Sequence, residues 1–424
     1  MNAEVNQTPA ILGGPRAVNC DGAAANRWPA ITSEEEAAVL EVLRDGDLSL
    51  NAVTRELEDD YRRYFDKRHA LAHCNGTAAL LAGFFAIGLK PGDEVLVPSA
   101  THWASVVPML WVGAMPVFCE SELERLGIDP ADAEQRITSR TRAIVICHLW
   151  GMPSKMTELL ELARRHNLKV IEDASHAQGA TWRDKRCGTL GDVSIFSLQT
   201  SKLAPAGEGG MLLTDDAAIY ERAICLGDVM RIIELEGPNR RFAATSFGLK
   251  TRMAPLSAAV ARVQLTHLSE RNAKRNDNLG FLSGELERLG FQTFLPPAHI
   301  NRVYFEYLIR CPDDLAMPVE RLIEALRAEG CEVDHPRYPL LHQQPLFTEG
   351  LFAGIGALSG RDDLSLPNYR PDALPRTERE NERLIKLPSF PFAERPLLRE
   401  YVEAFQKVMS NASRIAKSKG AAAN

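Results

Sequence analysis

Between about residues 66 and 215, short apolar runs alternate with longer segments of helical periodicity. The apolar runs that predict strands are 94–98, 115–118, 143–148, 168–173 and 193–197. Between several of them lie segments that predict helices, such as 78–88 and 155–166. Near-continuous apolar strands that alternate with helices are typical of a mainly parallel sheet covered on both faces. The pattern therefore predicts an α/β fold whose functional loops gather at the carboxyl ends of the strands.

The chain on either side of this region has a different pattern. Upstream, a helix is predicted at 33–46, with Ser33 and Glu36 as a capping box, and another at about 54–66. Downstream, the predicted elements are a long helical stretch at 255–289, a strand at 303–310, a helix at 319–330, a strand at 331–335, a loop-rich region at 345–390 and a final helix at 396–417. We therefore expect an N-terminal segment (1–50) packed on the lobes, a large α/β domain (51–265), a smaller C-terminal α/β domain (266–417) and a disordered tail (418–424).

Composition narrows the class of protein. The net charge of −7 argues against a nucleic-acid partner, because phosphate backbones are bound by clustered Lys and Arg. No apolar run approaches the roughly 18 residues that span a bilayer, and the first residues do not have the pattern of a signal peptide. The eight cysteines are scattered without a C-x-x-C pair, which favours free thiols over disulfides or a zinc site. We expect a cytoplasmic protein without a metal site.

Three features of the α/β region are candidates for chemistry, and each also has an ordinary structural explanation. In N-G-T-A-A-L (75–80), the first amides of a helix could hold a phosphate, or Gly76 could make a turn and Thr77 cap the helix. Asp173 ends a buried strand, where it could face a ligand crevice or simply form a cap or a loop salt bridge. Lys202 follows a strand in a Ser-, Gly- and Pro-rich turn; it could form a Schiff base with an aldehyde or be a solvated loop lysine.

Together these features match the requirements of one cofactor. Pyridoxal phosphate (PLP) needs a phosphate cradle, an acid beside its pyridine nitrogen and a lysine for its aldehyde. The helix start at Gly76, Asp173 and Lys202 supply these three groups in a parallel α/β region. Ser197, at the end of the preceding strand, adds a hydroxyl that could bond the phosphate. The combination predicts a PLP site.

The sequence also resembles the DegT–StrS family of fold type I PLP-dependent aminotransferases, which act on nucleotide-linked keto sugars and cyclitol ketones. The segments that carry the resemblance are 11–15, 75–80, 91–101, 113–118, 171–180, 188–197, 201–210, 251–259, 337–345 and 387–391. They cover nearly the whole chain, and the block 171–210 is highly specific. The resemblance implies a fold type I transferase that is a homodimer with shared active sites.

Carried over position by position, the family pattern assigns roles to individual residues. Lys202 would be the Schiff-base lysine and proton shuttle, and Asp173 the partner of the pyridine nitrogen. His176 falls where the family has Gln or His beside the cofactor ring. The phosphate would be held by Gly76, Thr77, Ala78 and Ser197.

Several positions depart from the common pattern or leave alternatives open. Where many members stack an aromatic ring on the cofactor, this chain has His102, with Trp103 as the alternative. Lys250 replaces the usual Asn in the segment that reaches the neighbouring subunit's phosphate, and a lysine there could contact that phosphate as a point charge. Arg252 is a candidate for an anionic substrate group or for a structural ion pair, and His342 lies in a loop that the family uses near the substrate. His148, at a strand end, is expected to be packed rather than catalytic.

The function implied by the resemblance is amino transfer from glutamate or glutamine to a keto sugar, a cyclitol ketone or a related carbonyl acceptor, in secondary-metabolite or cell-surface sugar biosynthesis. One alternative is a PLP-dependent sugar dehydratase, although relatives with that activity replace the lysine by histidine, and Lys202 is present here. The others are a non-catalytic protein that kept the fold and a fold type I enzyme acting on amino acids.

Overall fold

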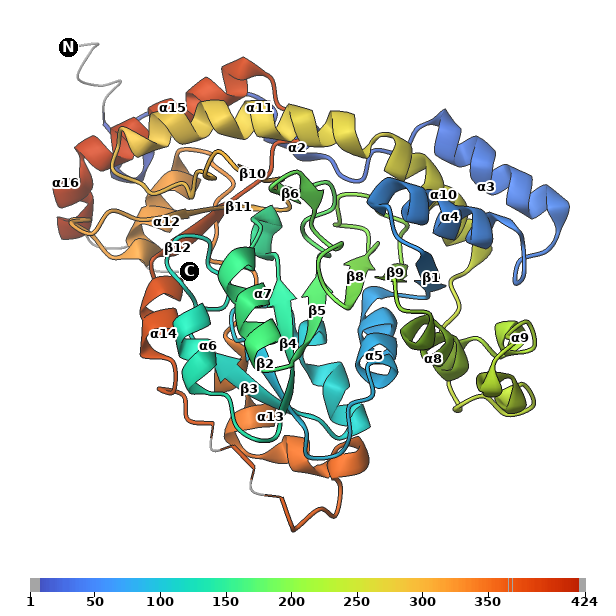
Figure 1. Ribbon diagram of the computed structural model, residues 1–424. Coiled ribbons are helices and arrows are strands. Elements are labelled where there is room, and N and C mark those ends of the chain that lie inside the picture. Colours follow the sequence, from blue (N-terminus) through green and yellow to red (C-terminus); the bar gives the residue numbers. More distant parts are fainter. Residues whose placement is uncertain (1–7, 365, 368, 419–424) are drawn as a thin grey trace.

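The computed structural model describes residues 8–364, 366–367 and 369–418, and its centre is a seven-stranded sheet (Figure 1). The strands, in their spatial order, are β1 (His69–His73), β9 (Gly210–Thr214), β8 (Val193–Ser197), β5 (Lys169–Asp173), β4 (Thr141–Cys147), β2 (Glu94–Pro98) and β3 (Met115–Cys119). From β8 to β3 all neighbours are parallel, whereas β9 runs antiparallel to both β8 and β1. The predicted α/β fold with a mainly parallel sheet is confirmed, and so are the predicted strands of this region.

Successive residues of the sheet pack into different hydrophobic clusters, as the two-residue period of a strand requires. In β9, Leu212 joins the cluster that contains α5 (Gly76–Ala86) and α8 (Ala217–Gly227). Its neighbours Met211 and Leu213 join the cluster that contains α4 (Val53–Phe65) and α10 (Pro255–Thr266). Both faces of this part of the sheet are therefore covered by helices, which explains why its strands are apolar without alternation.

The C-terminal part of the chain has a second hydrophobic cluster around a small antiparallel sheet of β11 (Tyr307–Arg310) and β12 (Leu384–Leu387). Three helices pack there: α11 (Leu268–Glu287), α12 (Val319–Ala328) and α15 (Arg395–Ser410), of which α11 and α15 lie side by side (Figure 1). Ala17 and Val18 from the N-terminal segment are buried in the same cluster. This α/β arrangement agrees with the expected smaller unit, while the exact domain boundaries stay predictions.

The remaining helices and strands are α2 (Gly22–Asn26), α3 (Ser33–Asp45), α6 (Pro130–Gln135), α7 (Met156–Arg165), α9 (Val229–Ile232), α13 (Pro345–Thr348), α14 (Pro375–Asn381), α16 (Ala412–Lys417), β6 (Thr181–Trp182), β7 (Lys185–Arg186) and β10 (Ile300–Asn301). Short 3₁₀ segments lie between several of them.

The structure corrects several element boundaries. The capping box of α3 is one residue earlier than predicted: Thr32, in extended conformation, accepts the amide of Glu34, and Glu35 accepts the amide of Thr32 at 2.7 Å. Both T-x-x-E and S-x-x-E fit the motif, so the sequence alone did not separate them.

Other predicted elements are shorter or divided. The stretch 255–289 breaks at His267 into α10 and α11, and the final helix breaks at Asn411. The predicted strand at 303–310 begins only at Tyr307. The segment 331–335 is not a strand, since only Asp334 pairs, through an isolated bridge with Lys386. Of the tail expected to be disordered, residues 419–424 lie outside the described part of the chain.

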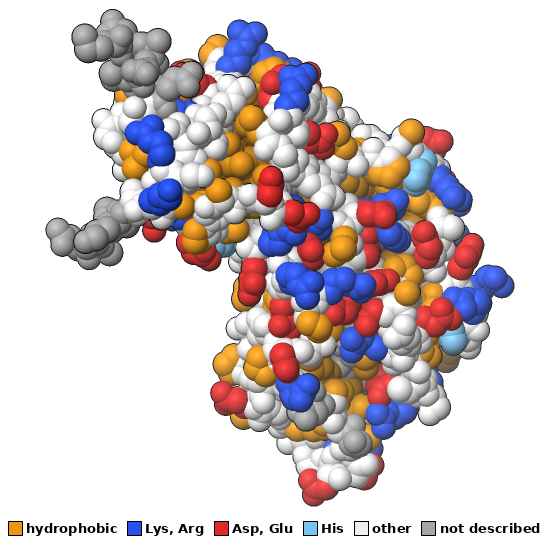
Figure 2. Space-filling view, turned by 90° about the vertical axis from the view of Figure 1, so that its left-hand side faces the viewer, with side chains coloured by type: hydrophobic (Ala, Val, Ile, Leu, Met, Phe, Trp, Pro, Cys, Tyr) orange, Lys and Arg blue, Asp and Glu red, His pale blue; other side chains and the backbone are white. Residues whose placement is uncertain are grey.

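On the face shown in Figure 2, acidic and basic side chains are interspersed with apolar ones rather than gathered by sign. Within the described residues, no helix is long and apolar enough to cross a membrane. All eight cysteines are free thiols, as predicted.

Candidate active site

A cavity of about 520 Å³ lies at the carboxyl ends of β2, β4, β5 and β8 and at the start of α5. This is the place that parallel α/β topology predicts for a ligand. Among the residues proposed from the sequence, those that line it are Gly76, Thr77, His102, Trp103, Asp173, His176, Ser197 and Lys202. One cavity therefore brings together the helix start, the strand-end carboxylate and the amine.

The start of α5 has the form of a phosphate cradle. The side chain of Asn75 caps the helix by accepting the Ala78 amide at 2.8 Å, so the unpaired amides of the first turn are those of Gly76 and Thr77. The Ser197 hydroxyl oxygen accepts the Gln199 amide at 3.3 Å and keeps its own hydrogen to donate. A Cβ at position 76 would stand 2.9 Å from Ser197 Cβ, so the cradle requires glycine there. Of the four residues proposed to hold the phosphate within one chain, only Ala78 does not line the cavity.

Asp173 is held in a fixed orientation by two serines. The Ser105 hydroxyl donates to Asp173 Oδ2 at 2.6 Å, and the Ser175 amide donates to Oδ1 at 3.1 Å. The carboxylate is 9% exposed at the end of β5, within the cavity lining. A buried, oriented carboxylate fits a protonated pyridine nitrogen. Neither serine was found from the sequence, because nothing local distinguishes either from other serines.

Lys202 has the environment of a reactive amine rather than of a solvated loop residue. It is 8% exposed, and its Nζ lies 4.2 Å from the centroid of the Phe305 ring. Burial lowers the pKa of the amine to about 8, although the Asp173 carboxylate acts in the opposite direction. A larger fraction of the amine is therefore neutral near physiological pH than for an ordinary lysine.

An aromatic wall borders the amine and was not predicted as a unit. His176 stacks on Phe305 with ring centroids 4.0 Å apart, and Tyr338 stacks on Trp150 at 5.1 Å. His176 Nδ1 accepts the Trp150 amide at 3.4 Å, so Nε2 carries the hydrogen and donates to the Tyr338 oxygen at 3.2 Å. Burial and the nearby Lys202 charge hold the pKa of His176 well below its usual value, which keeps this ring neutral.

A model of the DegT/DnrJ/EryC1/StrS aminotransferase family matches residues 29–395. The chain belongs to this family. GDP-perosamine synthase from Caulobacter vibrioides is 37% identical over 74% of this chain and 84% of its own. L-glutamine:2-deoxy-scyllo-inosose aminotransferase from Micromonospora echinospora is 32% identical over 91% of this chain and 94% of its own. In structure, an aminotransferase from Psychrobacter cryohalolentis matches with a TM-score of 0.80 and 25% identity, covering 91% of this chain and 99% of that one.

The protein is thus a PLP-dependent aminotransferase of fold type I. The residues present fit the cofactor: Gly76, Thr77 and Ser197 offer donors for a phosphate, Asp173 offers a carboxylate, and Lys202 offers an amine with a lowered pKa. The chemistry of the donor set and the space kept open by Gly76 both agree with it.

His102 and Trp103 both line the cavity of this aminotransferase, so the structure keeps both candidates for the ring-stacking position. His102 is half-buried and its Nδ1 accepts the Ala104 amide at 3.3 Å, whereas Trp103 is 49% exposed. Burial and the Lys202 charge lower the pKa of His102, which favours the neutral ring. A neutral, partly buried imidazole fits stacking better than an exposed indole, and His102 stays the predicted partner.

Lys250 and Arg252 do not line the cavity of this chain. Lys250 is exposed. Arg252 lies in a separate cavity of about 260 Å³, where its Nη2 is 3.3 Å from Ser49 Oγ. Within a single chain neither residue reaches the cofactor cavity, and the roles proposed for Lys250 and Arg252 stay predictions.

Two histidines are parts of the buried framework. His342, proposed to bind substrate, has no exposed surface, and its ring nitrogens bond Ser99 Oγ at 2.7 Å and Glu378 at 3.0 Å. It does not line the cavity, so the structure supports a structural role in place of substrate contact. His148 borders the cavity but is held by Glu172 at 2.9 Å, as expected for a packed strand-end histidine. The described residues contain no cluster of His, Cys, Asp and Glu that could hold a metal.

Proposed function

We propose that this enzyme transfers the amino group of glutamine or glutamate to the ketone of a sugar or a cyclitol. The observation that carries the proposal is the convergence of Lys202, Asp173 and the Gly76 cradle on one cavity. The two relatives described above are named for GDP-perosamine synthesis and for amino transfer from L-glutamine to 2-deoxy-scyllo-inosose. These names support a carbohydrate or cyclitol acceptor and a glutamine donor.

Bound PLP would supply the electron sink and carry the amino group between the two substrates. The Gly76 and Thr77 amides and the Ser197 hydroxyl would bind its phosphate, and Asp173 would keep its ring nitrogen protonated. The Lys202 amine would accept a proton from the substrate carbon and return it, because its lowered pKa suits both steps near neutral pH. The aromatic wall beside the amine would limit the access of water to the reacting atoms.

The decisive test is Lys202→Ala, assayed with glutamine or glutamate and a panel of keto sugars and cyclitol ketones. Turnover should disappear, while Lys185→Ala, which removes an exposed lysine of β7, should leave it unchanged. A Lys202→Ala enzyme that still transaminates would refute the assignment.

The same samples separate the alternatives. An acceptor that loses water without gaining nitrogen would identify a dehydratase. A catalytic enzyme should show a visible absorbance band that borohydride removes. A protein that shows no such band would be a non-catalytic relative. Activity with amino acids alone would identify the third alternative.

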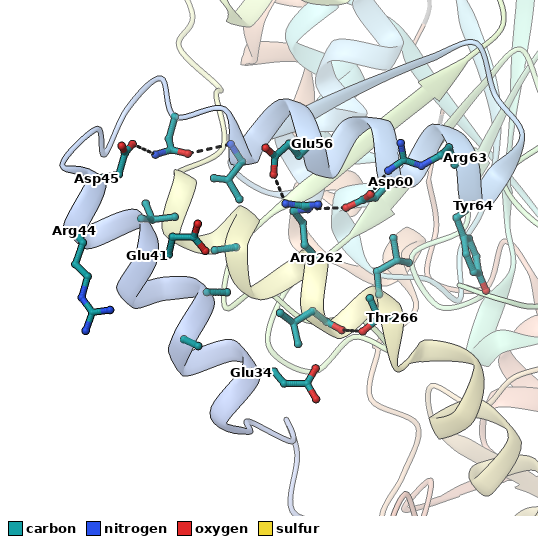
Figure 3. Close-up of a pocket in the computed structure, with 18 of the residues that line it drawn as sticks. Glu34, Glu41, Arg44, Asp45, Glu56, Asp60, Arg63, Tyr64, Arg262 and Thr266 are labelled. Atoms are coloured by element: carbon teal, nitrogen blue, oxygen red, sulfur yellow. Dashed lines mark hydrogen bonds and ion pairs between the residues drawn. The ribbon is translucent and has the colours of Figure 1, made fainter.

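We also propose that the enzyme is a homodimer with shared active sites and a cytoplasmic location, the latter supported by its free thiols. The loop between α3 and α4 exposes Leu48 (51%) and Leu50 (55%), and α3 exposes Leu40 and Leu43. A groove of about 1240 Å³ lies between α3, α4 and α10 (Figure 3). Four exposed leucines on one helix and the loop that follows it support a contact with a second copy of the chain.

Arg262 stiffens the floor of that groove. From α10, its guanidinium pairs with two carboxylates of α4, Glu56 and Asp60, the latter at 2.7 Å (Figure 3). The helices behind the exposed leucines are thus tied together within one chain, which would present a preformed surface to the partner.

Complementation between inactive variants tests the sharing of sites. Lys202→Ala and Arg252→Ala should each be inactive alone. If Arg252 completes the partner's site, a mixed dimer contains one site with both native residues, and mixing the two variants should restore up to roughly a quarter of the wild-type activity. No recovery after subunit exchange, confirmed by mass, would contradict shared sites.

A further inference from the structure

A second cavity of about 450 Å³ lies beside the turn that carries Lys202. It shares two lining residues, Ser201 and Arg337, with the cofactor cavity. Its other walls come from Trp28 after α2, from Arg275 on α11, from the segment that follows β12 and from residues that include the carboxylates Glu306, Glu332 and Asp334. The two cavities are thus neighbours, separated by the Lys202 turn.

Arg275 is the unusual residue of this second cavity. It is 2% exposed, and its guanidinium lies 4.2 Å from the centroid of the Trp28 ring. Its Nε and Nη1 are buried without a hydrogen-bond partner among the described residues, and no carboxylate of these residues pairs with it. Burial and the nearby Arg271 lower its pKa to about 9, which is far below the usual value for an arginine.

A buried arginine without a counter-ion is costly. Arg302 is a second buried arginine without an ion pair among the described residues, but its Nη1 donates to the Phe294 backbone oxygen at 2.9 Å. The buried Arg231 pairs with Glu58 at 2.7 Å. In the second cavity itself, Arg337 pairs with Glu306, and Arg327 pairs with Asp334 at 3.0 Å. These pairings occupy two of the three carboxylates that line the cavity, and the third, Glu332, accepts a hydrogen bond from Asn26 at 3.0 Å. None of the three forms an ion pair with Arg275, in a cavity with room for a ligand group.

Trp28 connects this cation to the catalytic lysine. One face of its ring lies against Arg275, and its indole N–H donates to the backbone oxygen of Lys202 at 3.0 Å. Ser201, which lines both cavities, precedes that lysine. A group bound at Arg275 would therefore stand next to the turn that positions the amine.

We propose that the second cavity is an anion subsite in which Arg275 binds a carboxylate or phosphate group of a substrate whose reacting end lies at Lys202. The inference rests on the proposed function, since it assigns a part of a transamination substrate to this cavity. A planar guanidinium can bind either kind of oxyanion through paired hydrogen bonds, for which the buried, unpaired Nε and Nη1 of Arg275 would have to turn toward the cavity. An amino acid donor brings a carboxylate, a nucleotide-linked acceptor brings a diphosphate, and an unphosphorylated cyclitol brings neither.

Thermal unfolding of the PLP-saturated enzyme, with glutamine or inorganic pyrophosphate added, tests the subsite. Excess PLP keeps the cofactor's phosphate site filled, so that added anions report on other sites. Each probe that uses the subsite should raise the melting temperature of the wild type in a concentration-dependent way. Arg275→Met, of similar length and without charge, should weaken that dependence at least about tenfold in apparent affinity.

Arg302→Met is the matched control. Arg302 is also buried and stacked on a ring, 4.0 Å from that of Tyr304, but it does not line the second cavity. Its replacement changes a buried arginine without changing the subsite, so the ligand dependence should stay as in the wild type. Should Arg275→Met fail to fold, Arg275→Gln provides a second neutral variant with the same expectation.

The pattern of losses identifies the source of the anion. If Arg275→Met weakens the effect of glutamine alone on the melting temperature, the subsite belongs to the donor carboxylate. If it weakens the effect of pyrophosphate alone, the subsite belongs to a phosphorylated acceptor. If it weakens both effects, the site accepts either oxyanion. Unchanged ligand dependence in Arg275→Met and Arg275→Gln would overturn the inference. An Arg275-dependent shift in a protein that transaminates no substrate would leave the subsite standing and contradict the proposed function instead.

Discussion

Replacing Lys202 by methionine is expected to stabilise the cofactor-free protein near pH 7, although the same change removes its catalytic amine. The side chain is 8% exposed, and its pKa is lowered from 10.5 to about 8, chiefly because burial disfavours the ammonium form. The Asp173 carboxylate offsets only part of that effect. Methionine is unbranched, flexible and apolar, so it can occupy the same space without a charge.

The magnitude follows from the displacement of the pKa. The fall from 10.5 to about 8 is about 2.5 units, and each unit corresponds to about 1.4 kcal/mol, so the buried ammonium costs the fold about 3 kcal/mol. Below pH 8 both the folded and the unfolded chain bind the proton, and the full cost is present. Between pH 8 and 10.5 the folded protein releases its proton first, so the cost declines with rising pH. The advantage of Lys202→Met should therefore be about 3 kcal/mol near pH 7 and small near pH 10.5.

Urea and thermal unfolding of the cofactor-free wild type and variant, at several pH values between about 7 and 10, measure this difference. Lys407→Met is a control of opposite sign. Lys407 is also 8% exposed, but its ammonium lies 3.0 Å from Glu329, so its removal leaves a buried carboxylate unpaired and should cost about 3–5 kcal/mol. A Lys202→Met protein less stable than the wild type near pH 7, or an advantage that does not shrink toward pH 10, would refute the reasoning.

Three further predictions concern the cofactor site and its frame. Gly76→Ala should weaken PLP binding about 5- to 150-fold in a cofactor titration. The new Cβ would stand 2.9 Å from Ser197 Cβ, and overpacking of this kind costs about 1–3 kcal/mol. Gly284→Ala is the control, because no atom lies within 4 Å of its Cβ. Asp173→Asn should lower kcat by about 10² or more, since the neutral amide cannot stabilise a protonated ring nitrogen; an unchanged kcat would argue against this role. His342→Leu should lower the melting temperature without changing KM for either substrate, because the ring has no exposed surface and lies outside the cavity, and a selective rise in KM would restore its proposed substrate contact.

The sheet was predictable where the sequence forms apolar runs bounded by turns, and less so elsewhere. Strand β1 reads H-A-L-A-H and has no β-branched residue, so it did not stand out, although it closes one edge of the sheet by pairing with β9. Strand β12 lies in a proline-rich region that was expected to be loop, and only its pairing with β11 explains it. Conversely, C-E-V-D-H has strand-like residues but lacks a partner along most of its length. Whether such a segment forms a strand depends on the strand that it pairs with, and the local sequence does not contain that information.

The chemical centre of the site was predictable because Gly76, Asp173 and Lys202 follow one another along a single α/β region. Each lies at or near the start or the end of a helix or strand. The supporting residues of the site were not predictable. Ser105 reaches Asp173 from 68 positions away, and Tyr338 reaches His176 from 162 positions away. Such contacts depend on how distant elements meet, and neither serine nor tyrosine carries a local mark of that meeting. Conversely, His342 occupies a motif position, but both of its ring nitrogens are engaged in hydrogen bonds, with Ser99 and Glu378.

The adjacent carboxylates at the end of β5 show why position in a strand, more than residue type, decides which one is available for chemistry. Consecutive residues of a strand point to opposite sides, so Glu172 and Asp173 cannot share an environment. Glu172 has no exposed surface, and it accepts hydrogen bonds from the amides of Gly188, Leu190 and Gly191 as well as from His148. A carboxylate with that many donors has no capacity left for a ligand, and its effect is to fix the turn before β8. Asp173, one residue on, accepts two hydrogen bonds and lines the cavity. Glu172 thus fixes the turn before β8 and the histidine that follows β4. This keeps Asp173 at the place where a cationic ring nitrogen would lie.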